Sequence, residues 1–240
     1  MDEYNPSITS PPSEEMMPIM NTPVVTTPGF FGNMLALWAG MSWLSGRRHP
    51  ERTWPSWILA GALSGFALVL ADVGHAFAHI LSARFAGAPI DQIKLSSGMP
   101  RTIYFNDQVP PRTHIMRAIG GPIFSVLGLG ISLLVRIFSP CNSMAREVAD
   151  WSCVGHGLIL TGSLAPLPMV VGGSLLKWTL VEKGRTPAEA DQIVRQAGVI
   201  TGIAACSAGT TLASRRHWLP AAGLLAAGTV ALGAALGKIR

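Results

Sequence analysis

The chain has 240 residues, of which 49% are hydrophobic and only 13% are charged, whereas a typical soluble domain is about one quarter charged. This composition excludes an ordinary soluble domain and predicts a polytopic helical membrane protein. The formal net charge of +5 does not indicate nucleic-acid binding, because the lysines and arginines fall in short loops between apolar runs, where membrane proteins keep them. The three cysteines have no C-x-x-C spacing, so neither a disulfide framework nor a zinc knuckle is expected.

The first 28 residues are rich in proline and contain four acidic side chains. Such a segment cannot bury a core, and we expect residues 1–28 to be a disordered tail. The chain starts with acidic residues rather than with a basic and then apolar stretch, so no cleavable signal peptide is predicted. The rest of the chain, residues 29–240, is expected to be one transmembrane domain.

Apolar runs in this domain predict about six transmembrane helices of ~20 residues each. The predicted spans are residues 30–44, 57–85, 118–138, 148–176, 197–213 and 219–236. The fourth span is interrupted by Pro166 and Pro168, since two prolines one residue apart stop a regular helix. Broken backbone inside a membrane is tolerated only where it lines a cavity or is buried in protein. This interruption therefore predicts a functional site beside it.

Between the second and third spans, residues 86–117 are polar. Alternation over residues 90–95 and 102–105, with a turn at Gly98 to Pro100, predicts a small β-hairpin insert. Residues 181–196 are predicted to be a surface helix that starts at Thr186. With six spans, this helix, the hairpin loop and both termini lie on one side, and the excess of basic residues places that side in the cytosol of a bacterial-type inner or plasma membrane.

A stripe of ionisable side chains follows the second span. Asp72, His75 and His79 recur at i, i+3 and i+7, so they share one face of a helix. Two histidines four apart are the ligands of H-E-x-x-H zinc sites, in which the glutamate after the first histidine is the general base. That place is Ala76 here. The stripe indicates either a metal or proton site or a hydrogen-bonded polar stripe that orders the helix bundle.

Three motifs make the chain resemble the site-2 protease family of intramembrane zinc metalloproteases (peptidase family M50), and above all its compact six-span group. Residues 74–79, followed by residues 83–89, resemble the family's G-H-E-x-x-H helix and the R-x-G-V-P after it. Residues 120–125 resemble its A-G-P-x-x-N span, and residues 163–173 resemble its N-L-L-P-x-P-x-x-D-G-G segment. The resemblance covers roughly residues 55–237. It assigns to the family's cleft the residues Gly121, Pro122, Ser125, Ser163, Pro166, Pro168, Val171 and Gly172.

The departures from the family are as informative as the matches. In the family, two histidines and the aspartate of D-G-G hold zinc, and the glutamate activates a water. Here His75 and His79 remain, but the glutamate is replaced by Ala76, the aspartate by Val171, and both motif asparagines by serine. Catalytic zinc normally has three protein ligands, so the two histidines alone are an incomplete zinc site. The resemblance therefore implies a degenerate, catalytically inactive member.

The favoured hypothesis is a pseudoprotease that uses the family's helix-binding cleft to hold another membrane protein, or that serves as an accessory subunit of a membrane complex. The proline-rich tail suits docking of a partner. One alternative is an active zinc metalloprotease in which Asp72 or His156 joins His75 and His79. Another is a small transporter or metal carrier that uses the polar stripe. The first hypothesis needs no cofactor, the second needs zinc, and none involves nucleic acid.

Overall fold

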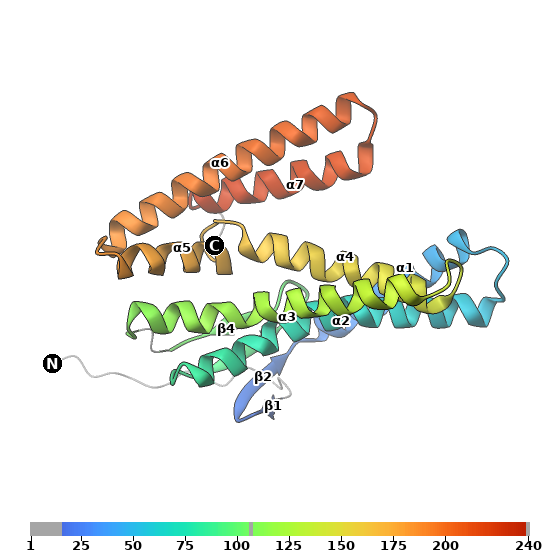
Figure 1. Cartoon of the computed structure of the whole chain (residues 1–240), viewed down its shortest axis with the longest axis horizontal. Coiled ribbons are helices and arrows are strands. Elements are labelled where there is room, and N and C mark those ends of the chain that lie inside the picture. Colours follow the sequence, from blue (N-terminus) through green and yellow to red (C-terminus); the bar gives the residue numbers. More distant parts are fainter. Residues whose placement is uncertain (1–15, 106–107, 239–240) are drawn as a thin grey trace.

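The computed structural model describes residues 16–105 and 108–238 of the chain, and within them there are seven helices and one small sheet, which lies at one edge of the molecule (Figure 1). In chain order the elements are β1 (Met16–Ile19), β2 (Thr22–Thr26), α1 (Pro28–Arg48), α2 (Trp54–Phe85), β3 (Gln92–Leu95), β4 (Arg101–Ile103), α3 (Pro111–Phe138), α4 (Met144–Leu164), α5 (Val171–Glu182), α6 (Pro187–Ser214) and α7 (Trp218–Ala235). Among these residues, four helices are long and apolar enough to cross a membrane: α2, α3, α6 and α7. The chain is thus a multi-pass membrane protein. The predicted number of six spans is not confirmed, because α1 and α4, with 21 residues each, are not apolar enough to join these four.

Local sequence sets where the helices begin. Proline occupies the first turn of α1, α2, α3 and α6, where its missing N–H would have no partner in any case. At the start of α6, Thr186 Oγ1 accepts a hydrogen bond from the Glu189 N–H, and the Glu189 carboxylate accepts one from the Thr186 N–H. The predicted helix start at Thr186 is confirmed.

The separate surface helix predicted over residues 181–196 is wrong. Helix α6 runs without a break from Pro187 to Ser214, so the amphipathic segment is the first part of a membrane-crossing helix. Its glycines do not interrupt it, because they face α7. A Cβ on Gly202 would lie 2.7 Å from Leu232 Cγ. Helices α6 and α7 form a hairpin that packs mainly against α5 (Figure 1).

The sheet has the strand order β1-β2-β3-β4. The β3–β4 pair is antiparallel, which confirms the predicted hairpin, and β2 lies parallel to β3. The prediction of a disordered tail does not hold for residues 16–26, which form the antiparallel pair β1–β2. Val24 and Val25 are buried there, so this stretch does contribute apolar surface to a core. Residues 1–15 of the predicted tail lie outside the described residues.

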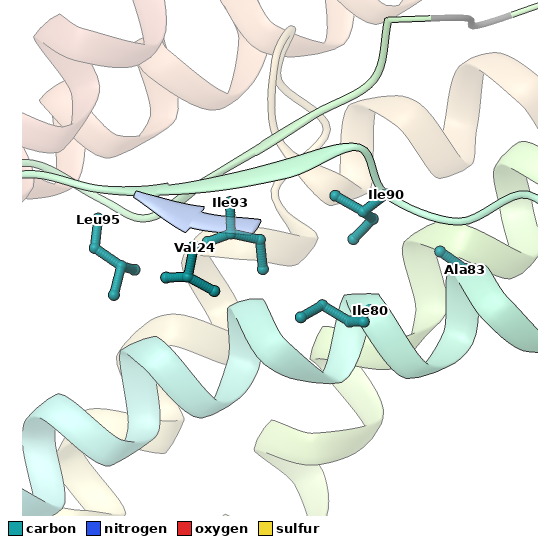
Figure 2. Close-up of a cluster of buried hydrophobic side chains, with 6 residues drawn as sticks. All are labelled: Val24, Ile80, Ala83, Ile90, Ile93 and Leu95. Carbon is teal, nitrogen blue, oxygen red and sulfur yellow. The ribbon is translucent and has the colours of Figure 1, made fainter. Parts of the chain in front are cut away.

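The sheet packs against the second half of α2. Figure 2 shows Ile80 and Ala83 of α2 beneath Val24, Ile93 and Ile90, which come from β2, β3 and the segment before β3. All five side chains are buried. This core fixes the hairpin alongside the helix that carries the two histidines.

Glycines bring the neighbouring helices close to α2. A Cβ on Gly61 would lie 2.3 Å from the Cα of Ser42 in α1, and a Cβ on Gly120 of α3 would lie 2.3 Å from the Ala78 carbonyl oxygen. Contacts this short need a residue without a side chain, as is common between membrane helices. Helix α2 is therefore the shared centre of α1, α3 and α4.

A buried carboxylate joins the end of α1 to the start of α4. Glu147, whose side chain is 4% exposed, forms an ion pair with Arg52 in the α1–α2 connection. Ser45 Oγ of α1 donates a hydrogen bond to the same carboxylate at 3.2 Å, and His49 Nε2 lies 3.7 Å from it. We call Ser45, His49, Arg52 and Glu147 the carboxylate clamp.

Candidate functional site

The two histidines of α2 are buried side by side, with 5.1 Å between their ring centroids. His75 Nδ1 lies 2.9 Å from Ser125 Oγ, and His79 Nδ1 lies 2.9 Å from the Arg117 carbonyl oxygen. Because a carbonyl oxygen only accepts, Nδ1 of His79 donates the hydrogen bond, and its Nε2 keeps a lone pair in the neutral ring. Ser125, at the position of a family asparagine, thus helps to orient His75.

Both Nε2 atoms point toward Gly121 of α3. A Cβ on Gly121 would lie 2.4 Å from Nε2 of His75 and 2.4 Å from Nε2 of His79. The absence of a side chain at this position therefore keeps the space between the two rings open. Pro122, the next residue, lies inside α3 and is buried with Gly121. The first and second family-like motifs meet at this point.

The connection from α4 to α5 carries the third motif. Helix α4 ends at Leu164 and α5 begins at Val171, which confirms the predicted interruption at Pro166 and Pro168. A Cβ on Gly172 would lie 2.2 Å from the Leu164 carbonyl oxygen, so the chain folds tightly back on itself here. Ser163 is buried and donates a hydrogen bond within α4, to the Leu160 carbonyl oxygen; the hydroxyl is not directed at the histidines by any bond among the described residues.

A cavity of about 210 Å³ brings the first and third motifs together. His79 and Val171 both line it, so the position of the family aspartate does lie near the histidine pair. The valine side chain has no atom that can bind a metal. The other aromatic and basic side chains of its lining were not identified from the sequence: Tyr104, His114, Arg117 and Trp178. We call this cavity the cleft.

The four additional residues form two stacked pairs in the cleft. The Arg117 guanidinium carbon lies 4.5 Å from the Tyr104 ring centroid, and Arg117 Nε donates a 2.8 Å hydrogen bond to the Ala88 carbonyl oxygen. The His114 and Trp178 rings are parallel, with centroids 3.7 Å apart. Arg117 could have been identified from the sequence, because it stands at the start of an apolar run. A charged side chain there is energetically unfavourable unless it has a partner or a function.

Asp72 and His156 do not join the histidine pair. His156 of α4 packs against α3, where a Cβ on Gly128 would lie 2.2 Å from its Cε1 atom, and its Nδ1 is buried without a hydrogen-bond partner among the described residues. Asp72 lines a different cavity, between α1, α2 and the hairpin. No group of three or more histidine, cysteine, aspartate or glutamate side chains that could hold a metal forms within the described residues. Within the described residues, the arrangement in which Asp72 or His156 joins His75 and His79 around one metal is therefore not assembled.

The residues present supply only part of a catalytic zinc site. Their orientation suits a metal, because an Nδ1 hydrogen bond on each ring is the usual support of a ligating histidine. The number of ligands does not suit a catalytic zinc, because such a zinc takes three protein ligands and a water, and only two histidines are present here. In the motif resemblance, Val171 falls where the third ligand is expected and Ala76 where the general base is expected. The described residues therefore do not fit a catalytic zinc.

No protein-family model matches the chain, and no curated protein matches it. A solved structure does: the Site-2 Protease from Methanocaldococcus jannaschii, with 18% sequence identity and a TM-score of 0.56, over 95% of this chain and 96% of that one. The chain therefore has the site-2 protease fold. This confirms, at the level of the fold, the resemblance that the three motifs predicted.

Proposed function

We propose that the protein is a non-catalytic member of the site-2 protease fold that holds another membrane protein in its cleft, either as a single partner or as a subunit of a larger membrane complex. One observation carries the proposal. The cleft and the oriented histidines are retained, while the two acidic positions hold Ala76 and Val171. Loss of one essential group lowers catalysis by several orders of magnitude, and here both a base and a ligand are replaced.

The unpaired edge of β4 beside the cleft suits a partner that binds through a segment of extended polypeptide. Strand β4 is the last strand of the sheet as described, so one of its edges is not paired within that sheet. Thr102 and Tyr104, in and next to this strand, line the cleft. An edge strand can bind an extended peptide through backbone hydrogen bonds, while pockets beside it receive alternate side chains.

Site-specific photo-crosslinking in the native membrane tests this function. A photo-reactive residue at Thr102 is expected to capture a discrete membrane protein, and the same residue at Val230, an exposed position on α7, is the matched control. The captured protein should also co-purify with the unmodified chain in a fixed stoichiometry. Equal labelling at both positions, or labelling by lipid alone, would refute partner binding in the cleft.

An active metalloprotease with rearranged ligands is the second candidate, favoured by the shared orientation of the two Nε2 atoms. It is tested by elemental analysis of the detergent-purified protein beside the variant His75→Ala/His79→Ala. About one zinc per chain that disappears in the variant would support this candidate and direct the search to a third ligand and to cleavage of a membrane helix. Absence of zinc from both samples would rule it out.

A further inference from the structure

A second polar feature lies at the other end of α2 from the cleft. There the end of α1 lies beside the start of α2 and the start of α4, and the α3–α4 connection is at the same end of the helices (Figure 1). The carboxylate clamp joins α1 to α4 at this point. Arg52 Nη2 also donates a 3.0 Å hydrogen bond to the Asn142 carbonyl oxygen of the α3–α4 connection. The side chains of this end are therefore presented by elements that are bonded to one another.

The last turn of α1 carries two neighbouring arginines, Arg47 and Arg48, and both are exposed. The guanidinium carbon of Arg47 lies 5.2 Å from the ring centroid of Trp43, one turn earlier on the same helix. The guanidinium carbon of Arg48 lies 4.8 Å from the ring centroid of Trp151 on α4. A guanidinium group over an indole face is held there by cation–π attraction, so both arginine side chains are oriented. We call Trp43, Arg47, Arg48 and Trp151 the arginine–tryptophan site.

Neither arginine of this site has an acidic partner. Arg47 and Arg48 form no side-chain hydrogen bond or ion pair with another residue in the described part of the chain. The acidic side chains at this end already have other basic partners: Glu51 pairs with His49, Glu147 with Arg52, and Asp150 with Arg136. The two arginines therefore leave positive charge at this surface that the described residues do not neutralise, and a ligand of complementary charge is anionic.

Exposed tryptophans place this surface at the level of the lipid headgroups. Trp43 is 61% exposed, and Trp54, the first residue of the membrane-crossing helix α2, is 68% exposed. Tryptophans near the ends of membrane segments lie in the interface between water and the acyl chains. Arg47 and Arg48 lie about one turn beyond Trp43 toward the end of α1, so their guanidinium groups are at the depth of the lipid phosphates.

We propose that the arginine–tryptophan site binds the phosphate of an anionic phospholipid. A planar guanidinium group can donate two parallel hydrogen bonds to phosphate oxygens, and two adjacent arginines offer this fork twice. Because stacking on the indole rings already restricts both side chains, less conformational entropy is lost when the lipid binds. Clusters of basic residues at the ends of membrane helices recognise anionic lipids in other proteins. The site is distinct from the cleft and does not rest on the proposed function.

Native mass spectrometry of the full-length protein in detergent tests the proposal, with phosphatidylglycerol and phosphatidylcholine of the same acyl chains added in equal amounts. The parent protein should bind phosphatidylglycerol in preference, because only this lipid carries a net negative charge. Arg47→Gln/Arg48→Gln should weaken the binding of phosphatidylglycerol about 30-fold, as expected for the loss of two basic side chains at an anionic surface. The matched control is Arg215→Gln/Arg216→Gln, which removes two adjacent exposed arginines that contact no aromatic ring among the described residues. The control should keep the preference.

No preference for phosphatidylglycerol in the parent protein, or an equal loss in both double variants, would overturn the proposal, since any effect would then reflect overall charge. Inorganic phosphate that displaces the lipid at equal concentration would also overturn it, because the site would then bind a free anion. The unfolding temperature without added lipid checks that the variants fold. If Arg47→Gln/Arg48→Gln does not, the single variants Arg47→Gln and Arg48→Gln take its place, and an undiminished preference in both would refute the site.

Discussion

The open space between the histidine rings makes a sharp prediction for Gly121→Ala. The added Cβ would lie 2.4 Å from both Nε2 atoms, whereas ordinary van der Waals contacts begin at 3.4 Å. The rings cannot turn away freely, because each Nδ1 is hydrogen-bonded to α3, the helix that also carries Gly121. Either the helices separate by about 1 Å or these hydrogen bonds are lost, and forced overpacking of this kind typically costs ~1–3 kcal/mol.

Gly130→Ala is the matched control, because Gly130 lies on the same helix and a Cβ there meets no atom within 4 Å. Alanine gains about 1 kcal/mol over glycine in a helix, and this gain is common to both variants. Equilibrium unfolding in detergent micelles should therefore show Gly130→Ala to be at least as stable as the parent protein. Gly121→Ala should be less stable than Gly130→Ala by ~1–3 kcal/mol.

Removal of the rings should rescue the larger side chain. In the background His75→Ala/His79→Ala, Gly121→Ala is expected to lose its penalty and to behave like Gly130→Ala. The double-mutant comparison isolates the contact from any general effect of either change. The same cost in both backgrounds, or equal stability of the two glycine variants in the parent protein, would show that the rings do not converge on Gly121.

Three further substitutions test other parts of the fold by the same unfolding measurement. Arg52→Ala should lower the free energy of unfolding by ~3 kcal/mol, because Glu147 would stay buried without its ion-pair partner. A decrease smaller than the error of the measurement would show that the ion pair of the carboxylate clamp does not stabilise the fold. Thr186→Ala should cost about 1 kcal/mol by removing a capping hydrogen bond, whereas Thr27→Ala, at a helix start without such a bond, should cost clearly less. Met169→Gly should stabilise the chain by about 0.5–1 kcal/mol, because Met169 is exposed and has φ of 68°, where glycine is unstrained; a destabilised variant would contradict this backbone assignment.

Features encoded by neighbouring residues were predictable from the sequence. The helix start at Thr186 and the break at Pro166 and Pro168 depend on proline and capping chemistry that acts over a few residues. The β3–β4 hairpin follows from alternation on both sides of one turn. The meeting of the three motifs was also predicted, but only through resemblance to a family. Spacing alone could not place Val171 and His79 on the same cleft.

Features that depend on distant partners were missed. Strand β2 was assigned to a tail because its partner, β3, lies after two helices in the chain. The stacked pairs of the cleft join residues from the hairpin, α3 and α5, such as Tyr104, Arg117 and Trp178, and no local pattern indicates such a meeting. Asp72 shares a helical stripe with the histidines, yet it borders another cavity, which is lined by α1, α2 and the turn between β3 and β4.

The parallel pairing of β2 with β3 constrains how the chain threads through the bilayer. One strand ends just before α1 and the other begins just after α2. Strands that share a ladder cannot lie on opposite faces of a membrane, so the polypeptide between Thr26 and Gln92 must return to the face that it left. Because α2 crosses the membrane, this requires a second crossing by α1, although α1 is less apolar than the other crossing helices. An enzymatic reporter fused ahead of Met16 and one inserted at Gly98 should accordingly be active in the same compartment. The sheet also cannot close until both intervening helices have been synthesised and inserted, which makes it a late step of biogenesis.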